Sequence, residues 1–450
     1  MGSLQTAGLT LLAFVASGAP GFAQDSAKPG LPEVAVCPKA IADIATCYEA
    51  RDSNGSNLLA AMPKNWNGKL IVFAHGGPYL EPPLASQGQL DLAKYSIAVK
   101  LGFAWIGSSY RREGYGVLMA AEDTDIARRF FLEHIGRPTL TILHGASYGG
   151  LVGARLLETR AKEPDGSLNY NGAFFNSGLV AGVPLAYEFR ADLRAVYQYY
   201  CKNLPRPDEP QYPLWMGVAS DSKMTLKELE GLVDDCTGVL QAPGARSEGQ
   251  RRNLANIIRV MGFSEKLLYR HMQSSTLLFH NIVQRTTNGR NPFSNIGVQY
   301  RGSDDDVTLN RDIPRFTADP DAVALLRADG QPTGNIPVPV VSIHSINDPQ
   351  VAVEVQSVYR STLIAAGNGE RLVQAFTDEP EHTGQSAPEV ASAINALMHW
   401  IEKGEKPSGQ SIETACEGLR GAYPGPCRYH PDFVPKPYST RYYARDPTTR

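Results

Sequence analysis

Apolar residues in the first third of the chain form short runs of strand length. Such runs lie at residues 69–74, 102–110 and 139–144, and another begins at Gly172. Between the second and third runs, residues 120–136 place apolar side chains such as Ile126 and Phe130 at helical spacing. Strands that alternate with helices pair in parallel, and near-continuous apolar strands suit a sheet that is covered on both faces. The pattern therefore predicts a mostly parallel α/β sheet with helices on both faces.

This alternation stops near residue 179 and resumes near residue 335. The intervening segment has helix-start patterns instead, with capping boxes at Thr225/Glu228 and Ser247/Gln250. Residues 335–349 and 371–382 then each contain a predicted strand, and residues 352–367 and 387–404 are predicted helices. We therefore expect an α/β core at residues 36–178 and 336–404, a helical insertion at residues 179–335, and a tail at residues 405–450 that wraps the surface.

The first 23 residues have the features of a secretory signal peptide. They carry no charge, contain an apolar run at residues 9–15, and end in Gly21 and Ala23, which suit cleavage after Ala23. The usual basic residue near the N-terminus is missing. The apolar run is too short to span a bilayer, so we expect a secreted or periplasmic protein with no stable membrane anchor.

The six cysteines fall in three pairs that are close in sequence. The pairs are Cys37 with Cys47, Cys201 with Cys236, and Cys416 with Cys427. No pair has the C-x2-C spacing that is typical of a zinc site. Six cysteines allow 15 connectivities. We predict the three local disulfides because short loops close most readily, and they fit an exported protein.

The charge balance excludes a nucleic-acid-binding protein. The chain has 43 basic and 46 acidic residues, a net charge of −3, and no long basic block. Residues 303–312 cluster acidic side chains that would suit calcium, but they lack the glycine and the terminal glutamate of an EF-hand loop. We expect a solvated loop there, no metal and no cofactor, and a small or neutral partner.

The sequence around Ser147 is typical of a nucleophile elbow. Gly145, Ser147 and Gly149 form a G-x-S-x-G pattern, with a predicted strand directly before it and a predicted helix directly after it. A serine hydroxyl needs an imidazole to take its proton and a carboxylate to orient that imidazole. Asp348 and His382 each follow a late strand, so both are expected at the same edge of the sheet as Ser147.

The order Ser147, Asp348, His382 and the segment "PKNWNGKLIVFAHGG" resemble the α/β-hydrolases, and in particular secreted serine esterases with a large helical lid. The resemblance covers residues 36–178 and 336–404. It implies an α/β-hydrolase fold with a large, mainly helical cap inserted after the strand near residue 175. It also implies an oxyanion hole formed by the N–H groups of Tyr148 and of Gly77 or Gly76.

Several residues offer alternatives to these assignments. A hydroxyl of Tyr79 or Tyr110 would replace the glycine donor, and Glu379 or Glu381 would replace Asp348 as the acid. The remaining histidines of interest are expected to have structural roles: His75 shapes the oxyanion loop, and His144 and His344 pack on strands.

Three functions fit these features. The favoured one is an exported serine hydrolase that cleaves a small-molecule or oligomeric carboxylic ester through an acyl-enzyme. The second is an exported peptidase or amidase, because "HGGP" and "SYGG" also resemble prolyl peptidases, which often hold a free amino terminus with an acidic pair. The third is a non-catalytic binding protein on the same fold. The sequence leaves the oligomeric state open.

Overall fold

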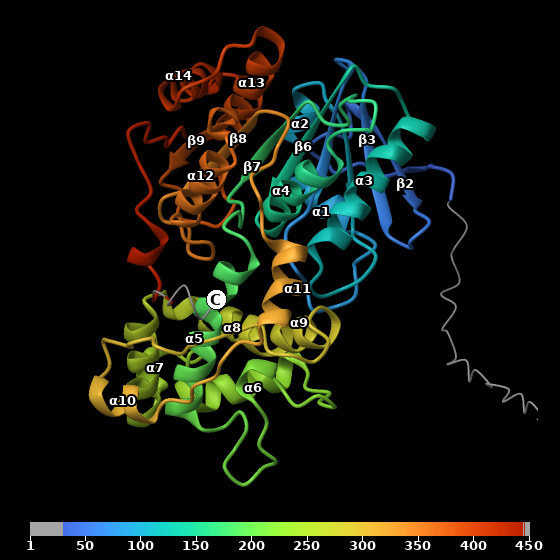
Figure 1. The fold of residues 1–450 in the computed structure, drawn as a ribbon. Coiled ribbons are helices and arrows are strands. Elements are labelled where there is room, and N and C mark those ends of the chain that lie inside the picture. The colour runs from blue at the N-terminus through green and yellow to red at the C-terminus, as the bar shows by residue number, and fades with distance from the viewer. Residues whose placement is uncertain (1–29, 444, 446–450) are drawn as a thin grey trace, which may run out of the picture.

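A computed structural model describes residues 30–443 and residue 445 of the 450-residue chain. The signal peptide expected at residues 1–23 lies outside the described residues. Within them, one mixed sheet is flanked by helices, and a group of further helices lies beyond one end of the sheet (Figure 1). None of the helices in this part of the chain is long and apolar enough to cross a membrane.

The sheet has nine strands in the order β1-β2-β3-β5-β4-β6-β7-β8-β9. The strands are β1 (Glu33–Ala35), β2 (Ala45–Arg51), β3 (Asn57–Pro63), β4 (Lys69–Ala74), β5 (Ala104–Ser108), β6 (Leu140–Ala146), β7 (Gly172–Asn176), β8 (Val340–Ser345) and β9 (Leu372–Thr377). From β5 to β9 all neighbours are parallel, and β1, β2 and β3 add an antiparallel edge. This topology, with helices on both faces, confirms the predicted α/β-hydrolase fold.

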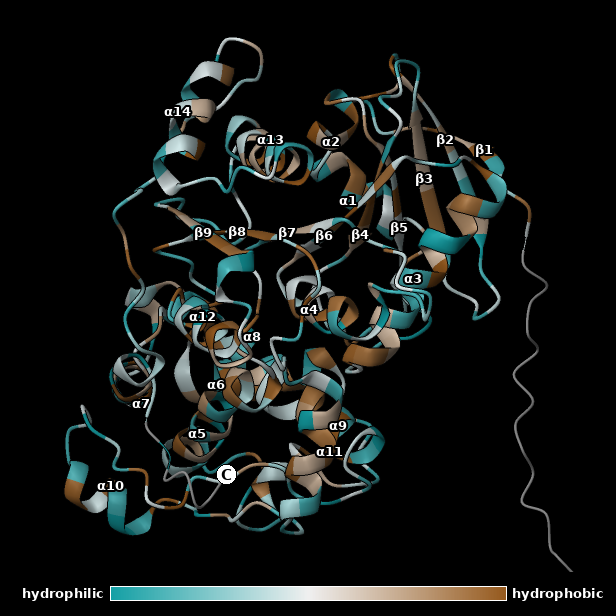
Figure 2. Ribbon diagram, turned by 45° about the horizontal axis from the view of Figure 1, so that its top comes forward, coloured by the Kyte–Doolittle hydropathy of each residue, from teal (hydrophilic) through white to brown (hydrophobic). Residues whose placement is uncertain are grey.

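Alternate residues of each central strand belong to opposite faces of the sheet. In β4, Leu70 and Val72 pack with one helical layer, whereas Ile71 and Phe73 pack with the other. Figure 2 shows the two layers on either side of the strands. The first layer comprises α3 (Val117–His134), α4 (Tyr148–Arg160) and α12 (Val355–Ala365). The second comprises α1 (Gln87–Lys94), α2 (Ile97–Lys100), α13 (Ala387–Lys403) and α14 (Gly409–Leu419).

Every regular element between β7 and β8 is helical. The α-helices are α5 (Val183–Cys201), α6 (Leu226–Thr237), α7 (Glu248–Met261), α8 (Leu268–Gln273), α9 (Phe279–Arg285), α10 (Asp306–Asp312) and α11 (Pro320–Gly330). A π-helical turn η4 (Ser274–Leu278) lies between α8 and α9, and the 3₁₀ turns are η1 (Leu214–Met216), η2 (Pro243–Ala245) and η3 (Glu265–Leu267). Both predicted capping boxes are confirmed at the starts of α6 and α7. Several of these helices, with α5 at the centre, enclose an apolar cluster of their own around Leu193, Ile257 and Met272.

Three disulfides join Cys37 to Cys47, Cys201 to Cys236, and Cys416 to Cys427, which confirms the predicted pairings. The last disulfide ties α14 to the segment that follows it.

The tail is more structured than the sequence analysis expected. It contains α14, which packs against α13, and Tyr429 pairs with Thr377 at the edge of β9. Further along, the buried Arg445 guanidinium forms an ion pair with Asp192 of α5 at 2.8 Å. The tail therefore connects the core to the helical insertion, which composition alone did not indicate.

The antiparallel strands β2 and β3 were not predicted. In β2 only Ala45 and Cys47 are buried and the later residues are half-buried or exposed, whereas residues 58–61 of β3 are all buried between the two helical layers. Neither short segment has a strong pattern without its neighbouring strand, since strand preference depends on packing against cross-strand partners.

Candidate active site

Ser147 lies on an abrupt turn between β6 and α4. Its φ is +55° and its ψ is −121°, a conformation that non-glycine residues rarely adopt. The chain passes so close to itself here that a Cβ on Gly145 would lie 2.4 Å from the carbonyl oxygen of Gly149. A Cβ on Gly149 would lie 1.9 Å from the carbonyl oxygen of Ala74. The two glycines are therefore required sterically, as the elbow pattern predicts.

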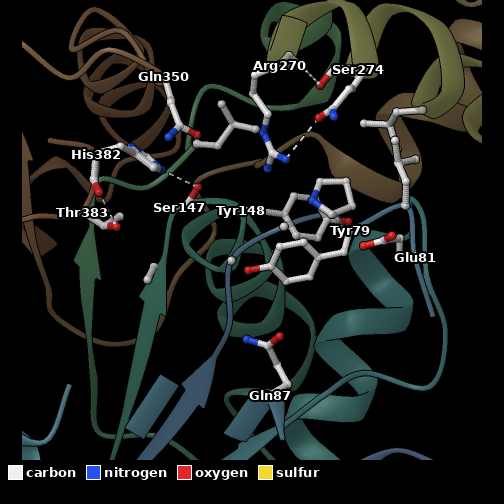
Figure 3. Close-up of a pocket in the computed structure, with 18 of the residues that line it drawn as sticks. Tyr79, Glu81, Gln87, Ser147, Tyr148, Arg270, Ser274, Gln350, His382 and Thr383 are labelled. Carbon is white, nitrogen blue, oxygen red and sulfur yellow. Dashed lines mark hydrogen bonds between the residues drawn. The ribbon is translucent and has the colours of Figure 1, made fainter. Parts of the chain in front are cut away.

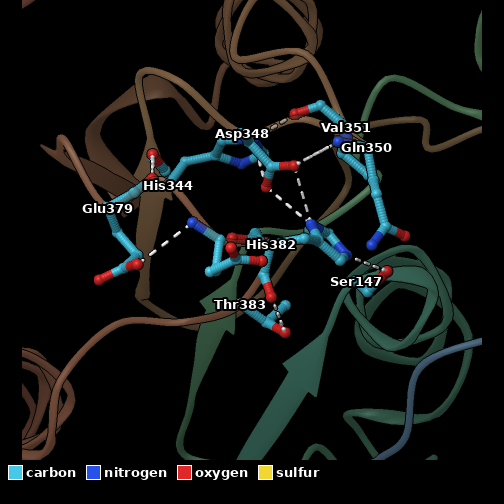
Figure 4. A network of polar contacts seen from close by, with 12 residues as sticks. Ser147, His344, Asp348, Gln350, Val351, Glu379, His382 and Thr383 are labelled. Carbon is cyan, nitrogen blue, oxygen red and sulfur yellow. Dashed lines mark hydrogen bonds and ion pairs between the residues drawn. The ribbon is translucent and has the colours of Figure 1, made fainter. Parts of the chain in front are cut away.

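The structure brings Ser147, His382 and Asp348 together at the carboxyl end of the sheet (Figure 4). The distance from His382 Nε2 to Ser147 Oγ is 2.8 Å. The other ring nitrogen, Nδ1, lies 2.7 Å from Asp348 Oδ2 and 2.9 Å from Oδ1. A carboxylate only accepts hydrogen bonds, so Nδ1 carries the proton and Nε2 of the neutral ring is left to accept one from Ser147.

Asp348 is buried and accepts hydrogen bonds from the backbone as well as from His382. Its Oδ1 accepts hydrogen bonds from the backbone N–H groups of Gln350 and Val351, each at 2.9 Å. Burial by itself raises the pKa of the Asp348 carboxyl, but the His382 ring and these hydrogen bonds outweigh burial and hold that pKa below its usual value. The acid is therefore ionised throughout the neutral range.

His344 also reaches this acid, which the sequence analysis did not expect of a strand histidine. Its Nε2 lies 2.8 Å from the carbonyl oxygen of Val351 and 3.6 Å from Asp348 Oδ2. Its Nδ1 lies 3.0 Å from Nε2 of Gln356, an amide nitrogen that can only donate. The ring therefore carries its proton on Nε2, which points at the loop that holds Asp348 (Figure 4).

The other candidate acids do not face His382 in this way. Glu379 forms an ion pair with Arg428 of the tail, and one of its carboxylate oxygens accepts the backbone N–H of Glu381. Neither glutamate makes a hydrogen bond or an ion pair with His382 among the contacts of the described residues.

Two buried histidines have surroundings that suit structural roles. The His75 ring stacks on Tyr110 with ring centres 3.9 Å apart, and burial lowers the pKa of His75 to about 4. His144 packs edge-on against Phe73 and Tyr95, and burial lowers its pKa to about 3. Both rings are neutral at any pH at which an imidazole base would work.

The predicted oxyanion loop lies beside the nucleophile. A Cβ built on Gly76 would be 3.6 Å from Ser147 Cβ, and one built on Gly77 would be 3.9 Å from the Tyr148 ring. Tyr148 is the first residue of α4, where backbone N–H groups have no partner within the helix. The Tyr110 hydroxyl donates to the carbonyl oxygen of His75 at 3.0 Å, so it is already engaged. The backbone N–H groups of Tyr148 and of Gly77 or Gly76 remain the predicted donors of the oxyanion hole.

A cavity of about 710 Å³ opens above these groups. Its floor includes Ser147, His382 and the loop at residues 76–84, and its far side is formed by α5, α8 and η4 of the insertion. Figure 3 shows Ser147, His382 and Tyr79 facing this space. Its volume is that of a site for a drug-sized molecule.

The insertion contributes two arginines to the cavity, Arg190 of α5 and Arg270 of α8. The sequence analysis missed both residues. Arg270 occupies a polar position in an amphipathic run, a pattern that does not distinguish a solvent-facing side chain from a cavity-facing one.

The acidic residues at 303–312 are engaged within the protein. Asp304 pairs with Arg259, Asp305 caps α10, and Asp306 accepts hydrogen bonds from Ser303. Residues 30–443 and 445 contain no group of three or more His, Cys, Asp or Glu side chains that is placed to hold a metal ion.

No family model matches this sequence, and no curated protein is similar to it in sequence. Distant likeness to solved structures does exist. An esterase from Aspergillus oryzae is 15% identical with a TM-score of 0.43, over 81% of each chain. Feruloyl esterase B from Aspergillus oryzae is 13% identical with a TM-score of 0.43, over 84% of this chain and 86% of that one.

A rice cell wall degrading esterase from Xanthomonas oryzae is 14% identical with a TM-score of 0.36, over 84% of this chain and 90% of that one. Structural likeness this distant does not transfer an activity or a substrate.

Proposed function

We propose that this chain is an exported serine hydrolase that cleaves carboxylic esters through an acyl-enzyme. The observation that carries the proposal is the continuous hydrogen-bond chain from Ser147 through His382 to Asp348 at the floor of a large cavity. A serine on a strained elbow, with an oriented imidazole and a buried carboxylate, is the arrangement that acyl transfer requires.

In the first half of the proposed reaction, Ser147 Oγ attacks the ester carbonyl carbon while His382 Nε2 takes the hydroxyl proton. The negative charge that develops on the carbonyl oxygen is stabilised by the N–H groups of Tyr148 and of Gly77 or Gly76. The bond from carbon to the alkoxy oxygen then breaks, and His382 returns the proton to the leaving alcohol. Water repeats the sequence on the acyl-enzyme and releases the acid and free Ser147.

The role of Asp348 is to orient and stabilise the imidazole. Because both of its oxygens lie within 3 Å of His382 Nδ1, the ring is held in the tautomer that leaves Nε2 free. The carboxylate also stabilises the imidazolium that forms when Ser147 attacks.

The peptidase alternative is less well supported than the esterase. Peptidases of the prolyl type often bind the free amino terminus of their substrate with an acidic pair. The described residues that the insertion contributes to the cavity include two arginines and no carboxylate. The carboxylates that line the cavity, Glu81 and Asp91, come from the core. Comparing p-nitrophenyl esters with aminoacyl p-nitroanilides tests this ranking, and faster anilide cleavage would reverse it.

A fluorophosphonate probe tests the proposal against a non-catalytic binding protein. The purified wild-type protein should be labelled at Ser147, which peptide mass spectrometry identifies, and Ser147→Ala should not be labelled. Ser167→Ala, which removes an exposed serine on the loop before β7, is the matched control and should label like the wild type. Absence of labelling in a folded wild-type protein would contradict the proposal.

We also propose that the protein is exported. The three disulfides fit an oxidising compartment, such as the periplasm or the extracellular space. Fractionation of a producing cell, with N-terminal sequencing of the mature protein, should find a chain that begins after Ala23.

A further inference from the structure

Two arginines of the insertion line the cavity above Ser147, and the carboxylates that also line it in the described part of the chain, Glu81 and Asp91, form no ion pair with either arginine. Arg190 and Arg270 both line it, and neither forms an ion pair with a carboxylate among the described residues. By contrast, Arg194, one turn after Arg190, has its guanidinium buried against the carbonyl oxygens of Leu204 and Gly217, away from this cavity. A cation without a counterion at a concave site favours an anionic ligand.

Arg190 is held in place by aromatic rings rather than by acids. Its guanidinium carbon lies 4.9 Å from the Tyr187 ring centre and 4.6 Å from that of Phe189. One terminal nitrogen donates to the carbonyl oxygen of Ala186 at 2.6 Å, and the buried Nε has no hydrogen-bond partner within residues 30–443 and 445. Such a guanidinium is oriented and still has donors to offer.

Arg270 approaches the site from the opposite helix. Figure 3 shows its side chain descending from α8 into the space that Ser147 and His382 also face. Its one polar side-chain contact in the described structure is with Gln273 Oε1, at the long distance of 3.5 Å. Burial lowers the pKa of Arg190, and the charge of Arg270 lowers it further, so the two guanidinium groups repel each other.

The helix that carries Arg270 continues into the π-helical turn η4, whose Ser274 and Leu278 also line the cavity. Such turns are rare and often occur at functional sites. Beside the arginines, the lining includes Leu84, Leu90, Leu226 and Leu278, which suit an apolar body.

We propose that the cavity selects esters that carry a free carboxylate, held by Arg190 and Arg270 while Ser147 attacks the ester carbonyl. This inference rests on the proposed esterase function and specifies its substrate class. A guanidinium binds a carboxylate with paired, charge-assisted hydrogen bonds, which give direction as well as attraction. The rest of the substrate is apolar and lies against the leucines.

The test compares esters in matched pairs that differ only in whether a distant carboxylate is free or methylated. For a carboxylate on the alcohol side, the pair is 4-(butyryloxy)benzoate and its methyl ester. For a carboxylate on the acyl side, the pair is monomethyl adipate and dimethyl adipate. The readout is the ratio of kcat/KM for the charged ester to kcat/KM for the neutral ester, and differences in intrinsic reactivity cancel when variants are compared.

For at least one pair, Arg270→Gln should lower this ratio by roughly tenfold, and Arg190→Gln should lower it by a similar factor, as expected for loss of a charge-assisted hydrogen bond. Arg270→Glu should lower it further and should favour a trimethylammonium analogue of the same ester. Arg252→Gln, at an exposed position on α7 outside the cavity, is the matched control and should leave the ratio unchanged.

Two outcomes would overturn the inference, and they can be told apart. If the wild type hydrolyses the neutral esters and folded Arg270→Gln and Arg270→Glu keep the wild-type ratio for both pairs, the carboxylate preference is wrong and the esterase function stands. If the wild type hydrolyses no ester and the fluorophosphonate fails to label Ser147, the proposed function itself is wrong. Arg270 is exposed, so its variants are expected to fold. They therefore test the carboxylate preference even if Arg190→Gln does not fold.

Discussion

The core and the helical insertion differ in whether the charged side chains that they bring to the site have partners within the chain. In the core, the carboxylate of Asp348 faces His382 and two backbone N–H groups, so this charge has its partners within the chain. In the insertion, Arg190 and Arg270 face the same cavity without a carboxylate partner among the described residues. On the proposed function, the core provides catalytic groups that act in the same way on every ester. The insertion provides cations whose counterion comes from the substrate.

The largest effect should come from the core. Ser147→Ala should lower kcat for ester hydrolysis by about a million-fold, because no other group supplies the nucleophile. His382→Ala should cost a similar factor, and the double variant should be scarcely worse, since the residues act as a unit. Steady-state kinetics on purified variants, with circular dichroism to establish folding, measures this. Near-wild-type activity in folded Ser147→Ala would remove the basis for assigning chemistry to the core.

Asp348→Asn should have the next largest effect, a loss of about ten-thousand-fold in kcat. An amide at this position favours the wrong tautomer of His382 and no longer stabilises the imidazolium, whereas Ser147 stays in place. The same assay measures it, with Glu379→Gln as the control for the alternative acid. A larger loss in Glu379→Gln than in Asp348→Asn would reverse the assignment of the two carboxylates.

A smaller effect is expected for His344, which contacts the Asp348 loop rather than the reacting atoms. His344→Leu removes the donor to the Val351 carbonyl oxygen and should lower kcat by about tenfold with little change in KM, as for loss of one hydrogen bond near a charge. His344→Gln can restore a donor and should recover part of the loss. A purely structural role would instead lower the melting temperature of both variants without separating their kcat values.

The core was largely predictable from the sequence because its patterns are local. The strand at residues 69–74 is continuously apolar, and the elbow at Ser147 needs glycines at two fixed positions, so each can be recognised within a short segment. The pairing of Cys37 with Cys47 at the edge of the core also follows from local spacing.

The contacts that the sequence did not indicate are long-range. His344 lies near Asp348 because the turn after β8 folds back toward the strand, and Arg190 and Arg270 line the same cavity because α5 and α8 both border it. The ion pair between Arg445 and Asp192 likewise joins residues 253 positions apart. Hydrophobic periodicity fixes which face of a helix is buried, but it does not fix which polar residue at the edge of that face borders a cavity.

The smallest effect should come from Asp91, which lines the core side of the cavity and, when ionised, carries the charge opposite to that of the insertion's arginines. Burial raises the pKa of the Asp91 carboxyl to about 7, against hydrogen bonding from Gln87 and the charge of Lys94, from an ordinary value of 3.8. The folded state thus holds this proton more tightly than the unfolded state. The contribution to stability is fully present below about pH 4 and is lost as the pH rises through about 7.

Asp91→Asn removes this ionisation and should therefore be more stabilising, relative to the wild type, at pH 8 than at pH 5. Melting temperatures of both proteins at the two pH values measure the difference, and Asp43→Asn, on an exposed turn of the core, is the control. The substitution also removes a negative charge that would oppose a substrate carboxylate above pH 7. The ratio of charged to neutral ester hydrolysis should accordingly fall with rising pH in the wild type and fall less in Asp91→Asn. An equal stability change at both pH values would mean that Asp91 ionises normally and that the core side of the cavity does not oppose the charge of the insertion.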